Sequence, residues 1–443
     1  MSVRDRLLLY LRKRLESDPV PLRLVFWDGY QFDFAPGPSV TLVLHSDEPI
    51  RALLRGNFER LGDAYVNGAI SIEGKIEDVL AVGISLAERF GRPGVLQRLT
   101  RLTRLIPHRR SAEADAANVQ HHYDVGNDFY RLWLDERMIY SCAYFKTGLE
   151  DIHTAQRQKL DHICRKLMVR PGERLLDIGC GWGGLLVWAV TRYGANGVGI
   201  TISERQYAYA KELVAASNLS DRIEIRRQDY RDLRHDSAFD KIVSVGMYEH
   251  VGLENLSSYF SIIADLLEPG GAFLNHGIVA TDPKGRARGP AGGEFIDRYV
   301  FPGGAVPHLS RVLVEISRAG LEFADAEDLR PHYALTLQHW SGRLEAHRSD
   351  AIRTAGERRF RIWRVFLAGM ACAFDRGWLS VAQVLSFKPL GSGGASRPWT
   401  RAYQYAENPP DRDAIPCAAT WTGPTTEEWA TEGPPSPQLR GVV

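Results

Sequence analysis

The sequence predicts an α/β protein, with a doubly wound, Rossmann-like sheet and a smaller α+β domain in front of it. Between residues 120 and 390, short apolar runs alternate with longer stretches of helical periodicity, which is typical of a parallel sheet covered by helices. One apolar run leads directly into a glycine-rich turn, LLDIGCGWGG at residues 175–184. Doubly wound sheets bind their ligands beside such turns, at the carboxyl ends of the strands.

The alternating pattern sets the expected strands and the division of the chain. Five strands are expected at residues 174–178, 197–202, 223–227, 241–245 and 272–279. Two later apolar runs, at 323–328 and 383–387, are expected to complete the sheet. The expected regions are an N-terminal domain at 1–105, a linker at 106–120, the α/β domain at 121–390 and a Gly- and Pro-rich tail at 391–443.

The N-terminal domain is expected to hold two strand regions, 25–34 with a turn at Asp28-Gly29 and 39–46, and two helices, 49–60 and 76–90. Behind it, leucines and arginines interleave at helical spacing in RPGVLQRLTRLTRLIPHRR, residues 92–110. This stretch is either a solvated helix packed on a core or a surface for anionic lipid headgroups. The same two interpretations, packing or membrane contact, apply to the apolar residues 7–11 and to FIDRYVFPGG at 295–304, expected as an apolar loop.

Composition excludes several classes of protein. A length of 443 residues favours two domains, and a net charge of +1 gives no general attraction to nucleic acid. The five cysteines form no C-x-x-C pair, so neither a disulfide scaffold nor a metal site is expected. No signal peptide is visible, and no apolar run reaches the roughly 18 residues that a membrane span needs. We therefore expect a cytoplasmic protein that touches a membrane peripherally.

The glycine turn distinguishes between two cofactors. It fits the dinucleotide pattern G-x-G-x-x-G, but that class places an acidic residue about 20 positions later to bind ribose. Thr201 and Ser203 occupy that place here. Asp177 instead completes D-x-G-x-G-x-G, the first motif of S-adenosylmethionine-dependent methyltransferases, in which residues without Cβ let the backbone pass beneath the ligand. With Asp229 after the third strand, the class I methyltransferase fold is favoured, and an NAD enzyme stays as the alternative.

Several longer strings extend this interpretation. HHYDVGNDFYRLWLDERMIYSCAYF at 121–145, GITISERQ, QDYRDL and FDKIVSVGMYEHVG resemble the cyclopropane-fatty-acyl-phospholipid synthases and the related mycolic acid cyclopropane synthases, over about residues 115–390. The resemblance implies that residues 121–390 form the catalytic domain. Because a phospholipid acyl chain must leave the bilayer to reach such a site, the N-terminal domain is our candidate for the part that docks on lipid. The resemblance further implies transfer of the methyl of S-adenosylmethionine to a cis double bond of an unsaturated phospholipid acyl chain. A bound bicarbonate then removes a proton, and the cyclopropane ring closes.

The resemblance also assigns residues. The catalytic and bicarbonate-binding set is Cys142, Glu249, His276 and Tyr333, with the backbone of Ile278. The cofactor-binding set is Tyr140, Ser141, Asp177, Gly179, Gly181, Gly183, Thr201, Ser203, Gln206, Asp229 and Tyr230. Two departures stand out: Tyr230-Arg231 replaces the Trp-Glu of some relatives, and Cys372 lies two residues away from a cysteine of many relatives, so it receives no catalytic role.

Two other outcomes stay open at this point. The same machinery without ring closure would give a methyl-branched, exomethylene or methylated polyene fatty acid, and the residues do not separate these products. A non-catalytic lipid carrier on the same scaffold would not need the full set of Cys142, Glu249, His276 and Tyr333. The acyl chain, the double-bond position, the headgroup, the role of the tail and a homodimer are not decided by the sequence.

Overall fold

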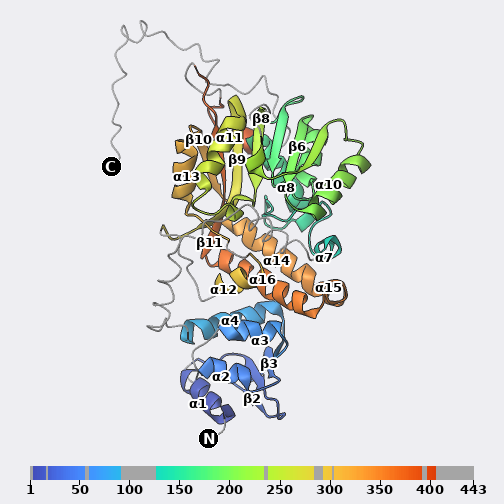
Figure 1. Ribbon diagram of the computed structural model, residues 1–443. Helices are drawn as coiled ribbons and strands as arrows, with labels where there is room; N and C mark the ends of the chain where they lie inside the picture. Colours follow the sequence, from blue (N-terminus) through green and yellow to red (C-terminus); the bar gives the residue numbers. More distant parts are fainter. Residues whose placement is uncertain are drawn as a thin grey trace, which may run out of the picture.

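The structure is a computed structural model that describes residues 3–15, 18–54, 59–90, 126–233, 238–283, 293–301, 304–391 and 397–405. A small N-terminal domain lies at one end of the molecule and a larger α/β domain at the other, with a group of helices between them (Figure 1). The expected fold class is confirmed.

The α/β domain is built on a seven-stranded sheet of order β10-β11-β9-β8-β5-β6-β7. The strands are β5 Arg174–Ile178, β6 Asn196–Thr201, β7 Ile223–Arg227, β8 Phe239–Val245, β9 Leu267–Ala280, β10 Glu322–Asp328 and β11 Leu379–Phe387. The five strands from β5 to β9 are parallel, and helices cover both faces of the sheet. On one face pack α8 Ile152–Lys166, α9 Gly184–Tyr193 and α10 Glu204–Ala216, and on the other α11 Leu256–Leu266 and α13 Leu309–Arg318.

The last strand corrects the expectation of a fully parallel sheet. β11 lies between β9 and β10 and is antiparallel to both. The reason is the connection from β10, which consists of three helices, α14 Arg330–Ala346, α15 Arg348–Ala355 and α16 Glu357–Asp375. These helices stay beyond the carboxyl edge of the parallel strands (Figure 1), so the chain enters β11 from that edge.

The N-terminal domain holds a four-stranded sheet, β2-β1-β3-β4, and four helices. Its elements are α1 Val3–Leu15, β1 Leu22–Val25, β2 Gln31–Asp33, β3 Val40–Leu44, α2 Glu48–Leu54, α3 Glu59–Val66, β4 Ile70–Glu73 and α4 Ile76–Phe90. The turn expected at Asp28-Gly29 connects β1 to β2. The single helix expected at 49–60 is instead the pair α2 and α3, and α1 and β4 were not expected.

Two stretches named as candidates for membrane contact turn out to be packed. Leu7, Leu8 and Leu11 are buried in the core of the N-terminal domain, because the apolar stripe of α1 faces its sheet. Residues 295–304 begin as a helix rather than a loop, since α12 spans Gly293–Tyr299 and the Tyr299 hydroxyl donates to Asp63 of α3 at 2.7 Å. The basic stretch 92–110 lies outside the described residues.

Helix α16 connects the two domains. Arg361 donates to the Tyr65 carbonyl at 2.8 Å, and Arg364 donates to the carbonyls of Ile72 and Gly74, both at 3.2 Å. These carbonyls belong to α3, to β4 and to the residue after β4. Two guanidinium groups therefore hold the N-terminal domain on the helix through main-chain atoms.

Residues 397–405 cover the β10 edge of the large sheet. Arg397 pairs with Glu322 of β10 at 2.8 Å, and the short helix α17 Ala402–Tyr405 packs on α8. None of the described helices is both long and apolar enough to cross a membrane.

Gly277 of β9 is required by close packing. Tyr248, in the turn after β8, lies flat against it, and a Cβ at residue 277 would come within 1.7 Å of the Tyr248 ring. The same tyrosine donates its hydroxyl to the Ile278 carbonyl at 2.5 Å. Only glycine lets both contacts form.

We predict that Gly277→Ala lowers the free energy of unfolding by about 3 kcal/mol, because the ring must leave its place. The control is Gly369→Ala in α16, where a Cβ meets nothing within 4 Å. Alanine favours helix, so this variant should stay within about 1 kcal/mol of wild type. Calorimetric melting of both variants measures the difference, and equal melting temperatures would contradict this packing.

Candidate functional site

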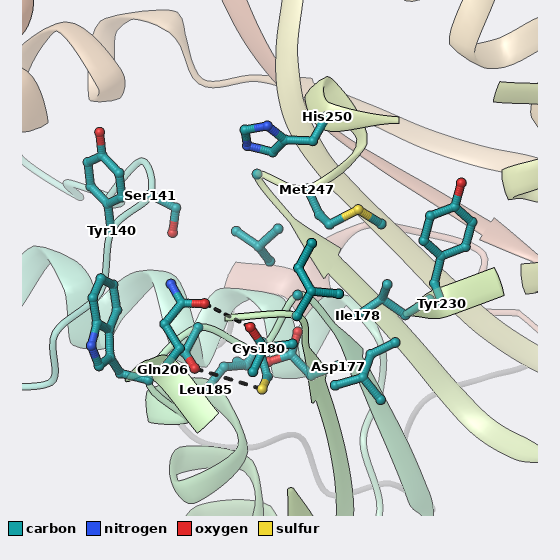
Figure 2. Close-up of a pocket in the computed structure, with 18 of the residues that line it drawn as sticks. Tyr140, Ser141, Asp177, Ile178, Cys180, Leu185, Gln206, Tyr230, Met247 and His250 are labelled. Atoms are coloured by element: carbon teal, nitrogen blue, oxygen red, sulfur yellow. Dashed lines mark hydrogen bonds between the residues drawn. The ribbon is translucent and has the colours of Figure 1, made fainter. Parts of the chain in front are cut away.

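A pocket opens at the carboxyl ends of β5, β6, β7 and β8. Figure 2 shows side chains from the end of β5, from the turns after β7 and β8 and from the segment that precedes α8, around one space. Nine of the eleven residues expected to bind the cofactor line it: Tyr140, Ser141, Asp177, Gly179, Gly181, Thr201, Gln206, Asp229 and Tyr230. The other two, Gly183 and Ser203, are not among its lining residues.

The three glycines of the turn have different roles. All have positive φ, at 81° for Gly179, 56° for Gly181 and 87° for Gly183, which glycine adopts without strain. A Cβ on Gly181 would meet nothing within 4 Å, so this backbone is the part of the turn left open for a ligand. A Cβ on Gly183 would lie 3.2 Å from Ala210 of α10, so this glycine serves helix packing.

Ser203 is the N-cap of α10. Its side chain accepts from the amide of Gln206, at 3.4 Å, which satisfies one of the free N–H groups at the start of the helix. Gln206 itself turns into the pocket, where its Oε1 accepts from the Thr201 hydroxyl at 2.8 Å. The serine therefore supports the pocket from outside it.

Asp229 is held by its neighbour. Its carboxylate accepts from the Arg231 amide and guanidinium at 2.8–2.9 Å. Burial raises the pKa of Asp229, but the hydrogen bonds and charge of Arg231 outweigh it, and the net pKa is lowered. The carboxylate is therefore ionised at neutral pH, at one side of the pocket.

A buried cation forms part of the other side. Lys159 of α8 lines the pocket, and its ammonium donates to Ser141 Oγ at 2.8 Å. Burial lowers the pKa of Lys159 to about 8 and raises the pKa of Asp177 to about 7, and the two charges partly offset these shifts. Sequence reasoning missed Lys159; the available signal was its helical spacing from Ala155 and Ile163, which places a lysine among apolar residues.

Glu249 follows β8 and faces the end of β9. Its Oε1 accepts from the Ile278 amide at 2.7 Å, whereas its Oε2 is buried without a hydrogen-bond partner in the described residues. Burial raises the pKa of Glu249 to about 7, and the bond from Ile278 opposes this shift. The carboxyl group can therefore carry a proton near neutral pH.

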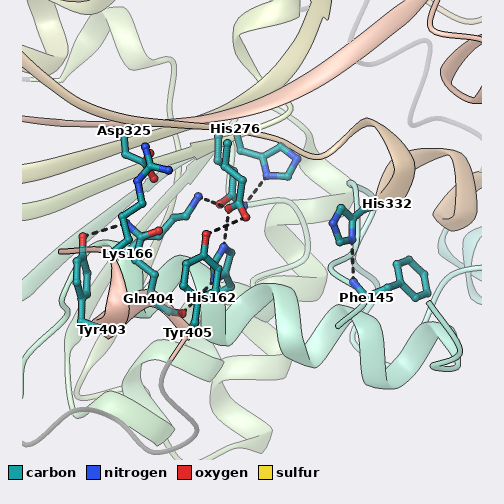
Figure 3. A network of polar contacts seen from close by, with 12 residues as sticks. Phe145, His162, Lys166, His276, Asp325, His332, Tyr403, Gln404 and Tyr405 are labelled. Carbon is teal, nitrogen blue, oxygen red and sulfur yellow. Dashed lines mark hydrogen bonds and ion pairs between the residues drawn. The ribbon is translucent and has the colours of Figure 1, made fainter. Parts of the chain in front are cut away.

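His276 is the second polar group left incomplete. Gln383 of β11 donates its amide to Nδ1 of His276 at 3.1 Å, and the Nε2 atom is buried with no partner among the described residues (Figure 3). Burial lowers the pKa of His276 well below its usual value, and the charge of Lys159 adds to this. The ring is therefore neutral. Because Nδ1 accepts a hydrogen bond from Gln383, the single ring proton lies on Nε2.

One chain of contacts joins the five residues of the expected bicarbonate set. Ile278, which binds Glu249, pairs with Val381 of β11, and the Val381 carbonyl accepts from the Leu329 amide at 2.8 Å. The Leu329 carbonyl then accepts from the Tyr333 amide at 3.0 Å and from the Cys142 thiol at 3.8 Å. His276 lies two residues before Ile278 on the same face of β9. The structure thus brings all five residues to one region at the carboxyl edge.

Apolar and aromatic side chains surround this region. Tyr140 contacts the rings of Trp133, Trp340 and Trp363, with centroids 5.3–6.0 Å apart, and Tyr333 packs on Phe374 at 4.5 Å. Burial raises the pKa of the Cys142 thiol, which therefore stays protonated. The pocket also has lining residues that were not singled out from the sequence, among them Met247, His250 and Gln228.

Fold and pocket together define a class I S-adenosylmethionine-dependent methyltransferase. The chain belongs to the family described as mycolic acid cyclopropane synthetase, whose model matches residues 110–384. A second model, of a domain of unknown function, matches residues 11–93.

Individual relatives agree with this family. A probable fatty acid methyltransferase of Pseudomonas putida is 44% identical over 401 residues, which are 90% of this chain and 100% of that protein. The cyclopropane-fatty-acyl-phospholipid synthase of Escherichia coli (strain K12) is 36% identical over 61% of this chain and 68% of that protein. The crystal structure of mycolic acid cyclopropane synthase CmaA1 complexed with SAH and CTAB matches with a TM-score of 0.59 and 35% identity, over 64% of this chain and 100% of that one. The chain is thus an S-adenosylmethionine-dependent fatty acid methyltransferase or cyclopropane synthase.

The raised pKa of Glu249 predicts a pH-dependent stability. Its pKa is about 7 in the folded chain and 4.5 as the ordinary value, so the folded state binds the proton more tightly. That contribution is complete below pH 4.5 and is lost as the pH rises toward 7. Glu249→Gln lacks this titration and should gain stability relative to wild type from pH 5 to pH 7.5, by at most about 3 kcal/mol. Melting temperatures of both proteins across this range test it, and a constant difference would contradict it.

Proposed function

We propose that this protein transfers the methyl group of S-adenosylmethionine to a cis double bond of an unsaturated phospholipid acyl chain, with bicarbonate-assisted deprotonation that closes a cyclopropane ring. The observation that carries the proposal is that two buried polar atoms, Glu249 Oε2 and His276 Nε2, have no partner among the described residues, while Ile278, on the same strand as His276, packs against an aromatic cluster. Unpaired polar atoms of this kind are costly unless a ligand completes them.

The cofactor side of the reaction depends on the pocket of Figure 2. S-adenosylmethionine supplies an electrophilic methyl group on a sulfonium. Gly181 leaves room for its close approach, and Tyr140 and Ser141 close the pocket on the side toward the aromatic cluster. In our proposal these groups hold the methyl group against the alkene, where proximity lowers the barrier.

The alkene side needs a dry surface that tolerates a positive charge. Methyl transfer to an alkene leaves a carbocation on the neighbouring carbon, and aromatic faces stabilise cations. Tyr140 and Trp340 are part of a buried cluster that continues to Tyr333 and Phe374. We assign the acyl chain to this cluster, because its apolar side chains also exclude water that would quench the cation.

The residues of the bicarbonate set suit a bound anion better than a bound cation. Neutral His276, the Cys142 thiol and a Glu249 carboxyl that holds its proton near pH 7 add no negative charge beside a bound anion. The N–H of His276 and the O–H of Glu249 can each donate to it. When bound, bicarbonate supplies a base for one proton of the transferred methyl group, and loss of that proton lets the ring close.

We further propose peripheral contact with the cytoplasmic face of a membrane through the N-terminal domain. Trp27 and Tyr30, in the turn between β1 and β2, each leave 43% of their surface exposed. Arg4 lies over the Tyr30 ring at 4.5 Å, and the outer face of α1 carries Arg6 and Arg12. Exposed aromatic rings beside arginines suit an anionic lipid surface.

A methyl-branched product without ring closure is the second candidate. It is favoured by the 44% identity to a protein named a probable fatty acid methyltransferase. Both candidates share the transfer step and differ only in which proton leaves.

The deciding experiment is incubation with methyl-labelled S-adenosylmethionine, monounsaturated phospholipid vesicles and bicarbonate. We expect labelled fatty acids heavier by one CH₂ that no longer react with a double-bond reagent, and less product when bicarbonate is removed. A labelled product that is heavier by one CH₂ and keeps a double bond would establish the second candidate. Absence of label in the lipid would overturn both.

Glu249→Gln tests the catalytic role directly. We predict that turnover falls by about 10²-fold or more, because the carboxyl group that orients the base is gone. Cofactor affinity, measured by calorimetry, should stay within about twofold of wild type, since Glu249 is not a lining residue of the cofactor pocket. The matched control is Glu254→Gln, an exposed residue of the same loop, which should retain activity. If the protein were a non-catalytic lipid carrier, the wild type, Glu249→Gln and Glu254→Gln would all show no turnover.

A further inference from the structure

The segment Tyr140–Cys142 stands between the two sites proposed above. Tyr140 and Ser141 line the cofactor pocket, whereas the Cys142 side chain is buried in the aromatic cluster and bonded to Leu329. A shift of this segment would disturb both sites at once. What holds it in place is therefore part of how the enzyme works.

Helix α8 holds the segment from below with two side chains one turn apart. Gln156 donates to the Ser141 carbonyl at 2.9 Å and to the Ile139 carbonyl at 3.4 Å. Lys159 donates to the Ser141 hydroxyl at 2.8 Å. Main chain and side chain of Ser141 are thus both fixed by the same rigid helix.

Lys159 is an unusual choice for a purely structural support. Its side chain is 2% exposed, and a buried ammonium is costly to desolvate. The groups that act on its charge are Asp135, Asp177 and the Cys142 thiol, and its own charge reaches His276. It therefore lies within electrostatic reach of both proposed sites.

We infer that Lys159 is a positioning residue that couples the cofactor pocket to the bicarbonate set by holding Ser141. Only the part of this inference that concerns the bicarbonate set rests on the proposed function, because the cofactor pocket does not depend on that proposal. The ammonium orients Ser141 toward the cofactor and, through the next peptide, fixes the position of Cys142 in the bicarbonate set. Its positive charge also favours an anion in the adjoining set.

Lys159→Met keeps the length of the side chain and removes its charge and donors. We expect it to weaken binding of S-adenosylmethionine, measured by calorimetry without lipid or bicarbonate, by about tenfold, as for a lost charged hydrogen bond. The bicarbonate concentration that gives half-maximal turnover should also rise. The control is Lys241→Met. Lys241 is a buried lysine near the amino end of β8, away from the pocket, and it is paired with Glu173 at 3.7 Å. The Lys241→Met variant should leave both quantities unchanged.

A double-variant cycle with Ser141→Ala separates positioning from general loosening. If Lys159 acts through Ser141, adding Lys159→Met to Ser141→Ala costs less than about twofold more in cofactor affinity. The inference would be overturned if the double variant lost cofactor affinity by the product of the two single-variant losses. It would also be overturned if folded Lys159→Met bound the cofactor with wild-type affinity. Should Lys159→Met not fold, Ser141→Ala alone decides, and wild-type cofactor and bicarbonate dependence in that variant would refute it. If Lys159→Met alters cofactor affinity but turnover of the wild type does not depend on bicarbonate, Lys159 keeps its positioning role toward the cofactor. The same result would reject bicarbonate as the base.

Discussion

One hydrogen bond, from the Ile278 amide to Glu249 Oε1, decides where the buried polar groups of this enzyme lie. It joins the ends of two central strands at the carboxyl edge, and it forms because Gly277 lets the Tyr248 ring lie against β9. The Tyr248 hydroxyl donates to the Ile278 carbonyl, so the N–H and C=O groups of Ile278 are both satisfied. The second oxygen of Glu249 is then left without a partner among the described residues.

Burial gives the two sites opposite electrostatic characters. The cofactor pocket contains a carboxylate paired with arginine, Asp229, and a buried lysine, Lys159, which suit a ligand with charges of both signs. Around Glu249 and His276, desolvation raises the pKa of the acid to about 7 and lowers the pKa of the imidazole, so both side chains can be uncharged near pH 7. The fixed charge nearest to His276 in effect is the ammonium of Lys159, which has the sign that suits a bound anion.

Local patterns predicted the parts of the structure that local physics determines. The strands β5 to β9 and the glycine turn follow from periodicity and from the φ values that only glycine adopts easily. Contacts between distant segments were beyond reach. The antiparallel insertion of β11 depends on where three helices pack. The burial of Leu7 depends on a sheet that is formed by residues later in the chain. The different roles of Gly181 and Gly183 depend on Ala210, a neighbour in another helix. Lys159 was missed because its significance comes from Ser141, eighteen residues earlier.

Helix α16 links the geometry of substrate delivery to that of the reaction. Its arginines, Arg361 and Arg364, bind carbonyls of the N-terminal domain, and further along the same helix Phe366 and Phe374 enter the aromatic cluster at Tyr333. A rigid helix transmits a displacement at one end to the other, since packed interiors resist deformation. If the N-terminal domain meets lipid as proposed, its orientation on the membrane fixes the orientation of the surface that receives the acyl chain. In that case α16 relates the lipid-facing domain to the aromatic cluster to which we assign the acyl chain.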